Sequence, residues 1–136
     1  MRVCLCILAA AFLCPAAEPQ TQTLDGKLVI AEGQPPQLET TAHKLIHLEG
    51  DDTTRAVLTD ERLNGFAVQT KGHFTAPDKF VIDPSHTRSM LVRQEGKLKM
   101  ITYWCEVCHI RAFTPGPCVC CYRETTLDLR DPNNIE

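Results

Sequence analysis

Five of the eight cysteines in this 136-residue chain lie close together, between Cys105 and Cys121. A disulfide framework that holds a whole small domain together spreads its cysteines along the chain. Here they are concentrated in one segment near the C-terminal end. We therefore expect one local site or staple, carried by a domain that folds without obligatory disulfides.

The first sixteen residues have the pattern of a secretory signal peptide. Arg2 precedes an apolar run that ends at Cys14, and small residues follow at positions 16–17, which is the typical order for such a signal. The run is shorter than the ~20 apolar residues that span a bilayer. We expect cleavage after Ala16, with a cut one residue later as the alternative. A lipid-modified Cys14 is less favoured because bulky residues precede it. The mature chain would be exported, either periplasmic or secreted, with no membrane span.

The remaining chain has the size and charge of one folded domain. Without Arg2 it has 13 basic and 17 acidic residues, and no long Lys/Arg cluster, which argues against nucleic-acid binding. A chain of about 120 residues buries roughly two thirds of its unfolded surface. We predict a disordered leader over residues 17–23, a single β-rich domain over 24–130 and a polar tail over 131–136. Its partner is expected to be a protein or a small ligand.

Short apolar runs between turn residues predict a mainly β domain, either a small antiparallel barrel or a sandwich. The clearest run covers residues 66–74, where Phe66, Val68 and Thr70 alternate with polar residues and Gly72 suggests a bulge. Residues 38–48 fit a helix or a strand, and we favour the strand. The other expected strands cover residues 24–30, 56–58, 80–82, 90–93, 98–104 and 123–129, with turns at 49–53 and 59–65.

Part of this pattern resembles an OB-type barrel. From residue 43 to 74 the chain has a strand, an acidic turn, a short strand, a Leu-Asn-Gly link and a long strand that ends near Gly72. The resemblance implies a small barrel. OB barrels often bind nucleic acids or sugars, and the acidic charge makes nucleic acid the less suitable ligand here.

The clustered cysteines include two C-x2-C pairs, Cys105 with Cys108 and Cys118 with Cys121. Two such turns can direct four thiolates at one point, which suits tetrahedral Zn²⁺. The arrangement over residues 103–122 resembles the paired Cys knuckles of zinc ribbons and rubredoxin-like sites, which implies these four cysteines as metal ligands. Cys120 is a fifth thiol: a spare, an alternative ligand or a route to a Cu(I) site.

In the knuckles of those families, glycine usually follows the second cysteine of each pair. In this chain His109 and Tyr122 stand at the two positions. The sequence therefore departs from the knuckle pattern at both turns.

Three other interpretations of the cluster stay open. Cys105, Cys108 and His109 match C-x-x-C-H, the attachment sequence of c-type haem. A C-x-x-C pair can also cycle between dithiol and disulfide in a redox protein. One or two disulfides could instead pin a C-terminal hairpin. For the haem alternative, the candidate sixth ligands are Met90, Met100, His73 and His86.

No motif in the chain indicates an enzyme. G-x-S-x-G, H-E-x-x-H and phosphate-binding glycine loops are absent from the sequence, and residues 59–62 are better explained as a polar turn than as a catalytic set. We therefore expect a non-catalytic binding or structural module. Its metal site would support a binding surface formed by the barrel and by Tyr103, Trp104 and Tyr122.

Overall fold

The computed structural model describes residues 15, 18 and 20–134. Nearly all of the predicted signal peptide (residues 1–16) lies outside this range. Among the described residues, none of the helices has the length and apolar character needed to cross a membrane.

Five strands close into a barrel in the order β1-β2-β3-β5-β4, and β4 pairs back onto β1. The β3–β5 pair is parallel, and the other pairs of the barrel are antiparallel. The predicted small OB-like barrel is thus confirmed. The five strands are β1 (Gln22–Val29), β2 (Gln37–Glu39), β3 (Leu45–Glu49), β4 (Ala67–Ala76) and β5 (Lys79–Ile82).

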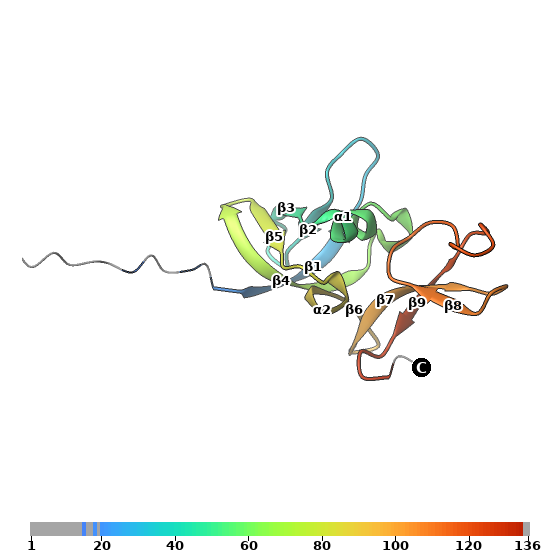
Figure 1. The fold of residues 1–136 in the computed structure, drawn as a ribbon. Helices are drawn as coiled ribbons and strands as arrows, with labels where there is room; N and C mark the ends of the chain where they lie inside the picture. Colours follow the sequence, from blue (N-terminus) through green and yellow to red (C-terminus); the bar gives the residue numbers. More distant parts are fainter. Residues whose placement is uncertain (1–14, 16–17, 19, 135–136) are drawn as a thin grey trace, which may run out of the picture.

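The sheet continues beyond the barrel through β6 (Met90–Gln94), which pairs with β4, and the long strand β7 (Lys97–Cys105). The far end of β7 is flanked by β8 (Ile110–Ala112) on one side and β9 (Thr126–Arg130) on the other. Figure 1 shows the barrel at one end of the molecule and β7, β8 and β9 at the other. Strand β7 therefore connects the barrel to the cysteine-rich segment.

Within residues 20–134 three short helices complete the fold: α1 (Asp52–Leu58), the 3-10 helix η1 (Glu61–Leu63) and α2 (His86–Ser89). The predicted strand over 56–58 is wrong, because these residues form the end of α1. The Asp51 side chain caps this helix by accepting a 2.8 Å hydrogen bond from the Thr54 backbone N–H, as N-terminal capping residues do. The helix buries Val57 and Leu58.

The strand prediction for 38–48 is right in type, but the segment forms two strands, β2 and β3, joined by a turn. The bulge lies between Phe74 and Ala76, not at Gly72. Gly72 serves a different purpose: a Cβ at this position would collide with the Val81 carbonyl. The leader prediction is wrong at its end, since β1 begins at Gln22, which pairs with Gly72.

Tyr103 on β7 is fully buried, so the prediction that it contributes to a binding surface is wrong. Its hydroxyl donates a 2.9 Å hydrogen bond to Asp60 Oδ2. Arg62 donates to both oxygens of the same carboxylate and, through Nη1, to the Thr125 carbonyl at 3.0 Å. The polar turn at 59–62 therefore ties the barrel to the C-terminal strands. Tyr103 belongs to the core cluster, together with Leu28, Leu38, Ile46, Leu48, Val57, Leu58, Leu63, Val68, Phe80, Ile82, Met90, Val92 and Ile101.

Candidate metal centre

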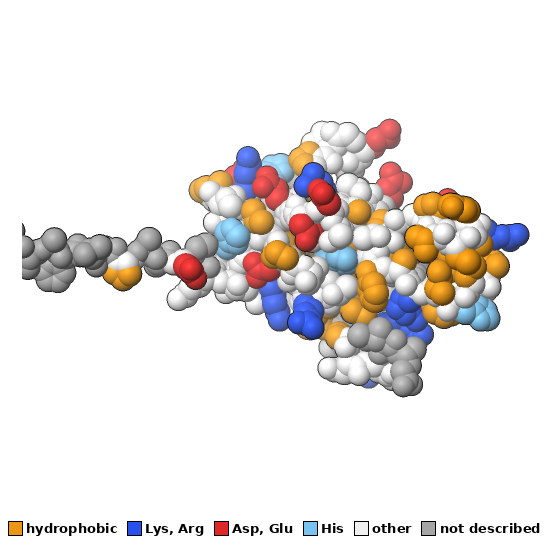
Figure 2. Space-filling model, viewed as in Figure 1, with side chains coloured by type: hydrophobic (Ala, Val, Ile, Leu, Met, Phe, Trp, Pro, Cys, Tyr) orange, Lys and Arg blue, Asp and Glu red, His pale blue; other side chains and the backbone are white. Residues whose placement is uncertain are grey.

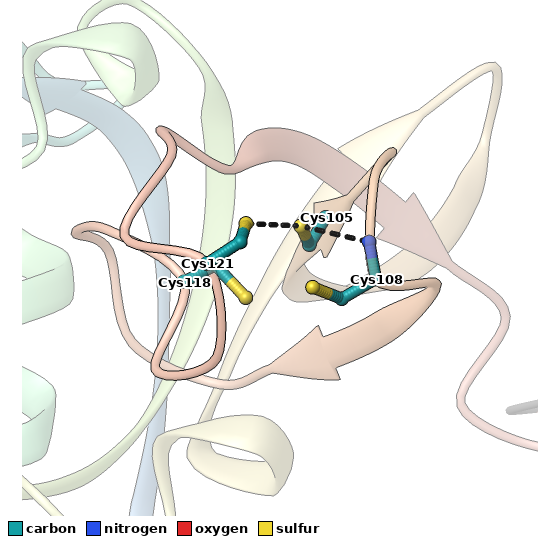
Figure 3. A group of neighbouring side chains, drawn as sticks. All are labelled: Cys105, Cys108, Cys118 and Cys121. Carbon is teal, nitrogen blue, oxygen red and sulfur yellow. Dashed lines mark hydrogen bonds between the residues drawn. The ribbon is translucent and has the colours of Figure 1, made fainter.

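The four predicted ligands come together: the Sγ atoms of Cys105, Cys108, Cys118 and Cys121 all lie within 4.8 Å of one another. Figure 3 shows the first pair at the turn that follows β7 and the second pair in the loop that precedes β9. The two pairs face each other, with Cys105 Sγ and Cys121 Sγ 3.6 Å apart. Four sulfurs converging in this way could hold a metal ion.

The two turns have matching backbones. In the first, the His109 N–H donates to the Cys105 carbonyl at 2.9 Å, and in the second the Tyr122 N–H donates to the Cys118 carbonyl at 2.9 Å. His109 and Tyr122 have φ values of 53° and 60°, the left-handed conformation that favours glycine. Both knuckles thus form without the glycine that the sequence lacks.

Backbone N–H groups also point at sulfur in each turn. The Cys108 N–H donates to Cys105 Sγ and the Cys120 N–H donates to Cys118 Sγ, both at 3.4 Å. Donors directed at sulfur stabilise the negatively charged thiolate, the form that binds metal. Backbone hydrogen bonds from Cys121 and Cys120 lower the pKa of Cys118 to about 7.

The pKa of Cys108 is shifted in the opposite direction from that of Cys118. Hydrogen bonds with the thiols of Cys120 and then Cys121 raise the pKa of Cys108 well above its usual range. Thiolates that gather without a cation repel one another. Each thiol in such a group therefore keeps its own proton more tightly. A bound cation supplies the positive charge that such a group of thiolates needs.

The second turn is fixed to the residues that lead into β9. The Cys118 N–H donates to the Arg123 carbonyl at 2.7 Å, and Pro117 forms an isolated antiparallel bridge with Glu124. The Thr125 hydroxyl donates to the Gly116 carbonyl at 2.9 Å. The arm formed by residues 115–117 thus returns the chain to the site, and Arg62 ties the nearby Thr125 to Asp60.

The first turn is supported by a stack of side chains on the β7–β8 hairpin. The His109 ring lies parallel to the Trp104 ring with their centres 6.0 Å apart, and the Arg111 guanidinium lies 5.0 Å from the Trp104 ring centre. Arg111 Nη1 donates to Thr102 Oγ1 and to Asp128 Oδ2, each at 2.7 Å. The sequence analysis did not identify this stack, although Trp104 and Arg111 would face each other in any hairpin with this register.

The five described cysteines carry no disulfide. The 3.6 Å between Cys105 Sγ and Cys121 Sγ is far beyond the roughly 2.05 Å of an S–S bond. Cys105 and Cys118 are buried, Cys108 and Cys121 are half-buried, and Cys120 is exposed. The predicted disulfide staple therefore finds no support here.

No family model matches the chain, and searches among curated proteins and among solved structures found no match. The fold and the site together define a mainly β protein with a closed five-strand barrel and a four-cysteine cluster that could bind a metal.

Proposed function

We propose that this chain is an exported, non-catalytic binding or structural module whose four-cysteine site holds Zn²⁺. The convergence of four Sγ atoms within 4.8 Å, from two turns of matching backbone, is the observation that supports it. The case for export rests on the signal-like pattern of residues 1–16.

Zinc is the metal that fits this donor set best. Soft thiolate ligands in a tetrahedral S4 arrangement select zinc or iron over hard cations. Four protein ligands complete the coordination of Zn²⁺ and leave no position open for water or substrate, which is typical of structural sites rather than catalytic ones. The metal would then lock the turn after β7 to the loop before β9.

The binding surface of the module lies around these two turns. Five of the seven large hydrophobic side chains exposed in the described chain belong to residues 107–122. Figure 2 shows hydrophobic side chains gathered at the end of the molecule that carries β8. Exposed apolar patches of this kind mark interaction sites. The five are Val107, Ile110, Phe113, Val119 and Tyr122.

The metal content of the full chain tests the zinc assignment. Untagged protein purified from an exported compartment without chelator should contain about one zinc per chain by elemental mass spectrometry. A metal-free preparation would contradict the proposal. Export itself is tested by the N-terminal sequence of the purified protein, which should begin at Ala17.

Cysteine variants test the ligand set. Cys108→Ser and Cys118→Ser should each strip the metal and lower the free energy of unfolding by several kcal/mol, since metal-binding free energy becomes folding free energy. Cys120→Ser is the matched control, because its thiol is exposed and lies outside the four-sulfur group. If Cys120→Ser removed the metal as well, the four-ligand assignment would be wrong.

A c-type haem at Cys105, Cys108 and His109 has weaker support. Haem attachment sequences normally open a helix, whereas His109 leads directly into strand β8. The His109 ring stacks on Trp104, and the Sγ atoms of Cys105 and Cys108 face two further cysteines. A colourless protein from cells that make c-type haem would eliminate this alternative; about one iron per chain with a red colour that survives acid–acetone extraction would establish it.

The thiol-redox alternative also has weaker support at Cys105 and Cys108. An attacking thiol needs a lowered pKa, but the pKa of Cys108 is raised by its thiol neighbours. The thioredoxin-like βαβ unit that usually carries such a pair is not among the described elements.

A further inference from the structure

A cavity of about 300 Å³ lies where α2 meets the C-terminal strands (Figure 1). Its lining residues are Thr87 and Arg88 of α2, Met100 of β7, Phe113 after β8 and Pro132 after β9. None of them belongs to the four-cysteine site. A volume of this size lies at the lower end of the range for small-molecule sites, so the cavity suits a small molecule.

Part of the lining is apolar. Met100 on β7 pairs with Leu91 on β6, so their side chains share one face of the sheet. Both are buried, whereas Phe113 is 43% exposed and Pro132 is half-buried. An apolar group placed against Phe113 would remove part of this surface from water, which is favourable. The lining therefore suits a hydrocarbon or aromatic group.

Helix α2 adds a positive charge that is not neutralised within the described chain. Five of the seven described arginines form ion pairs with aspartates, and the other two are Arg88 and Arg123. Of these two, Arg88 lines the cavity. Its neighbour Thr87 adds a hydroxyl that has no hydrogen-bond partner within residues 20–134. A guanidinium and a hydroxyl are thus both available to a ligand.

The acidic residue adjacent to this lining in the sequence is Asp131, which precedes Pro132. Its carboxylate accepts the Asn133 N–H at 2.9 Å, and it forms no ion pair with Arg88. The lining residues themselves include no carboxylate. The cavity therefore combines an apolar surface with one uncompensated cation.

We propose that this cavity binds a small molecule with an apolar body and a single carboxylate. The planar guanidinium of Arg88 matches the two carboxylate oxygens with parallel N–H donors, and the Thr87 hydroxyl can donate to the same group. The apolar body would lie against Phe113 and Met100. A phosphate carries more charge than the one cation of the lining would neutralise, so a carboxylate fits better.

The inference goes beyond the proposed function, because it assigns a second site that uses no cysteine. Only Phe113 is shared with the exposed apolar residues near the two turns. The ligand would contact elements from both parts of the molecule, α2 from the barrel side and the segments that follow β8 and β9.

The test titrates 3-phenylpropionate into the isotope-labelled full chain, followed by heteronuclear NMR. The amide signals of Thr87, Arg88 and Phe113 should shift and saturate, with a Kd of about 1 mM or lower. The matched probe is 3-phenylpropanol, which has the same ring but no charge, and it should bind about tenfold more weakly. Absence of saturable shifts at these residues, or equal binding of the two probes, would overturn the inference.

Arg88→Gln provides the decisive variant. Arg88 is exposed, so the fold should be retained, and the affinity for 3-phenylpropionate should fall about tenfold. Arg123→Gln is the matched control: Arg123 is also exposed and without an ion pair in the described chain, but it lies outside the lining. It should bind the probe as wild type does. Unchanged affinity in Arg88→Gln, or an equal loss in both variants, would contradict the assigned site.

The zinc content of the same samples separates this inference from the proposed function. Zinc-loaded protein that fails to bind 3-phenylpropionate would overturn the inference alone. Zinc-free protein that binds the probe through Arg88 would support the inference and contradict the zinc assignment.

Discussion

His109 and Tyr122 hold backbone conformations that side chains with a Cβ rarely adopt. Such a left-handed residue costs roughly 1–2 kcal/mol, and it persists only where the surrounding structure requires it. Here the requirement is the same at both positions, because each N–H closes its knuckle onto the carbonyl of the first cysteine. The two residues therefore carry strain that serves the placement of the sulfurs.

Replacing Tyr122 with glycine should relieve this strain. Tyr122 is 80% exposed, so little packing is lost, and Tyr122→Gly should raise the free energy of unfolding by about 0.5–1 kcal/mol after the entropy of glycine is counted. Urea denaturation of the metal-loaded protein measures the change.

The control for this measurement is Val119→Gly, in the same turn. Val119 is 84% exposed, and it is not among the residues with positive φ. This variant should lose stability rather than gain it. A destabilised Tyr122→Gly would show that the second turn does not hold the knuckle conformation in solution.

At this scale the sequence predicted that these four cysteines come together, but it did not predict how the turns would form. Cysteine spacing is a local property, so the two C-x2-C pairs can be recognised in the sequence directly. The left-handed conformation of His109 and Tyr122 is imposed by hydrogen bonds within the folded turns, and neither residue type indicates it. The burial of Tyr103 was missed because its partner Asp60 lies 43 positions away.

At the scale of elements, β4 is the strand on which the barrel closes. It pairs with β1, β5 and β6, and Gly72 is where the β5 backbone approaches it too closely for a side chain. The alternation of apolar and polar residues was sufficient to predict β4, since that pattern is a direct consequence of the strand period.

Gly72→Ala should therefore damage the barrel more than a strand substitution normally would. The added methyl group meets the Val81 carbonyl, which cannot move without breaking the β4–β5 pairing. We expect a loss of about 3 kcal/mol in the free energy of unfolding. Thermal and urea denaturation of the purified variant give the value.

Gly96→Ala is a useful comparison, because nothing lies near a Cβ at that position. Its positive φ of 75° makes it strained as well, so it should be destabilised by a smaller amount. If Gly72→Ala were the milder of the two, the close approach between β4 and β5 would be wrong.

The helix α1 shows where local patterns fail. Seven residues are too few to display a helical period, and the segment contains the β-branched residues Thr53, Thr54 and Val57, which favour strands. The cap at Asp51 and the burial of one face decide the conformation instead. Both depend on tertiary packing, which the sequence alone does not display.

Helix α2 places His86 in the interior of the described structure. The Phe113 backbone and the charge of Asp51 favour the protonated ring, but more weakly than burial opposes it. Burial is the dominant effect and lowers the pKa of His86 from 6.5. The unfolded chain therefore binds this proton more readily than the folded one.

Stability should accordingly fall as the pH drops below 6.5, until the pH passes the lowered pKa of His86. His86→Asn keeps a short polar group that does not titrate, so the unfolding free energy of this variant should depend less on pH between 7 and 5. Urea denaturation of both proteins at pH 7, 6 and 5 gives the two slopes. Equal slopes would mean that His86 is protonated as easily in the folded state as in the unfolded chain.

At the scale of the whole molecule, the barrel and the four-cysteine site are joined by β7 and by the contacts of Arg62. The barrel core is apolar and continuous, whereas the segment 105–122 exposes much of its apolar surface and has little core of its own. We therefore expect the folded structure of residues 105–122 to depend on a bound metal far more than the folded structure of the barrel does.

Hydrogen exchange with and without a metal chelator should reveal this difference. On removal of zinc, amides in residues 105–122 should lose protection, while those in β1 to β5 should keep most of theirs. Mass-spectrometric exchange on the full chain separates these peptides. Equal loss of protection in both regions would show that the molecule unfolds as one unit when the metal leaves.

The arrangement of the barrel also bears on the order of events during synthesis. All five barrel strands precede Cys105 in the chain. A polypeptide is synthesised with its N-terminus first, at roughly 5–20 residues per second. Every strand needed for closure is therefore synthesised before the first cysteine of the four-sulfur group. A metal ion held by the four cysteines would thus be captured late, by a segment that follows the complete set of barrel strands.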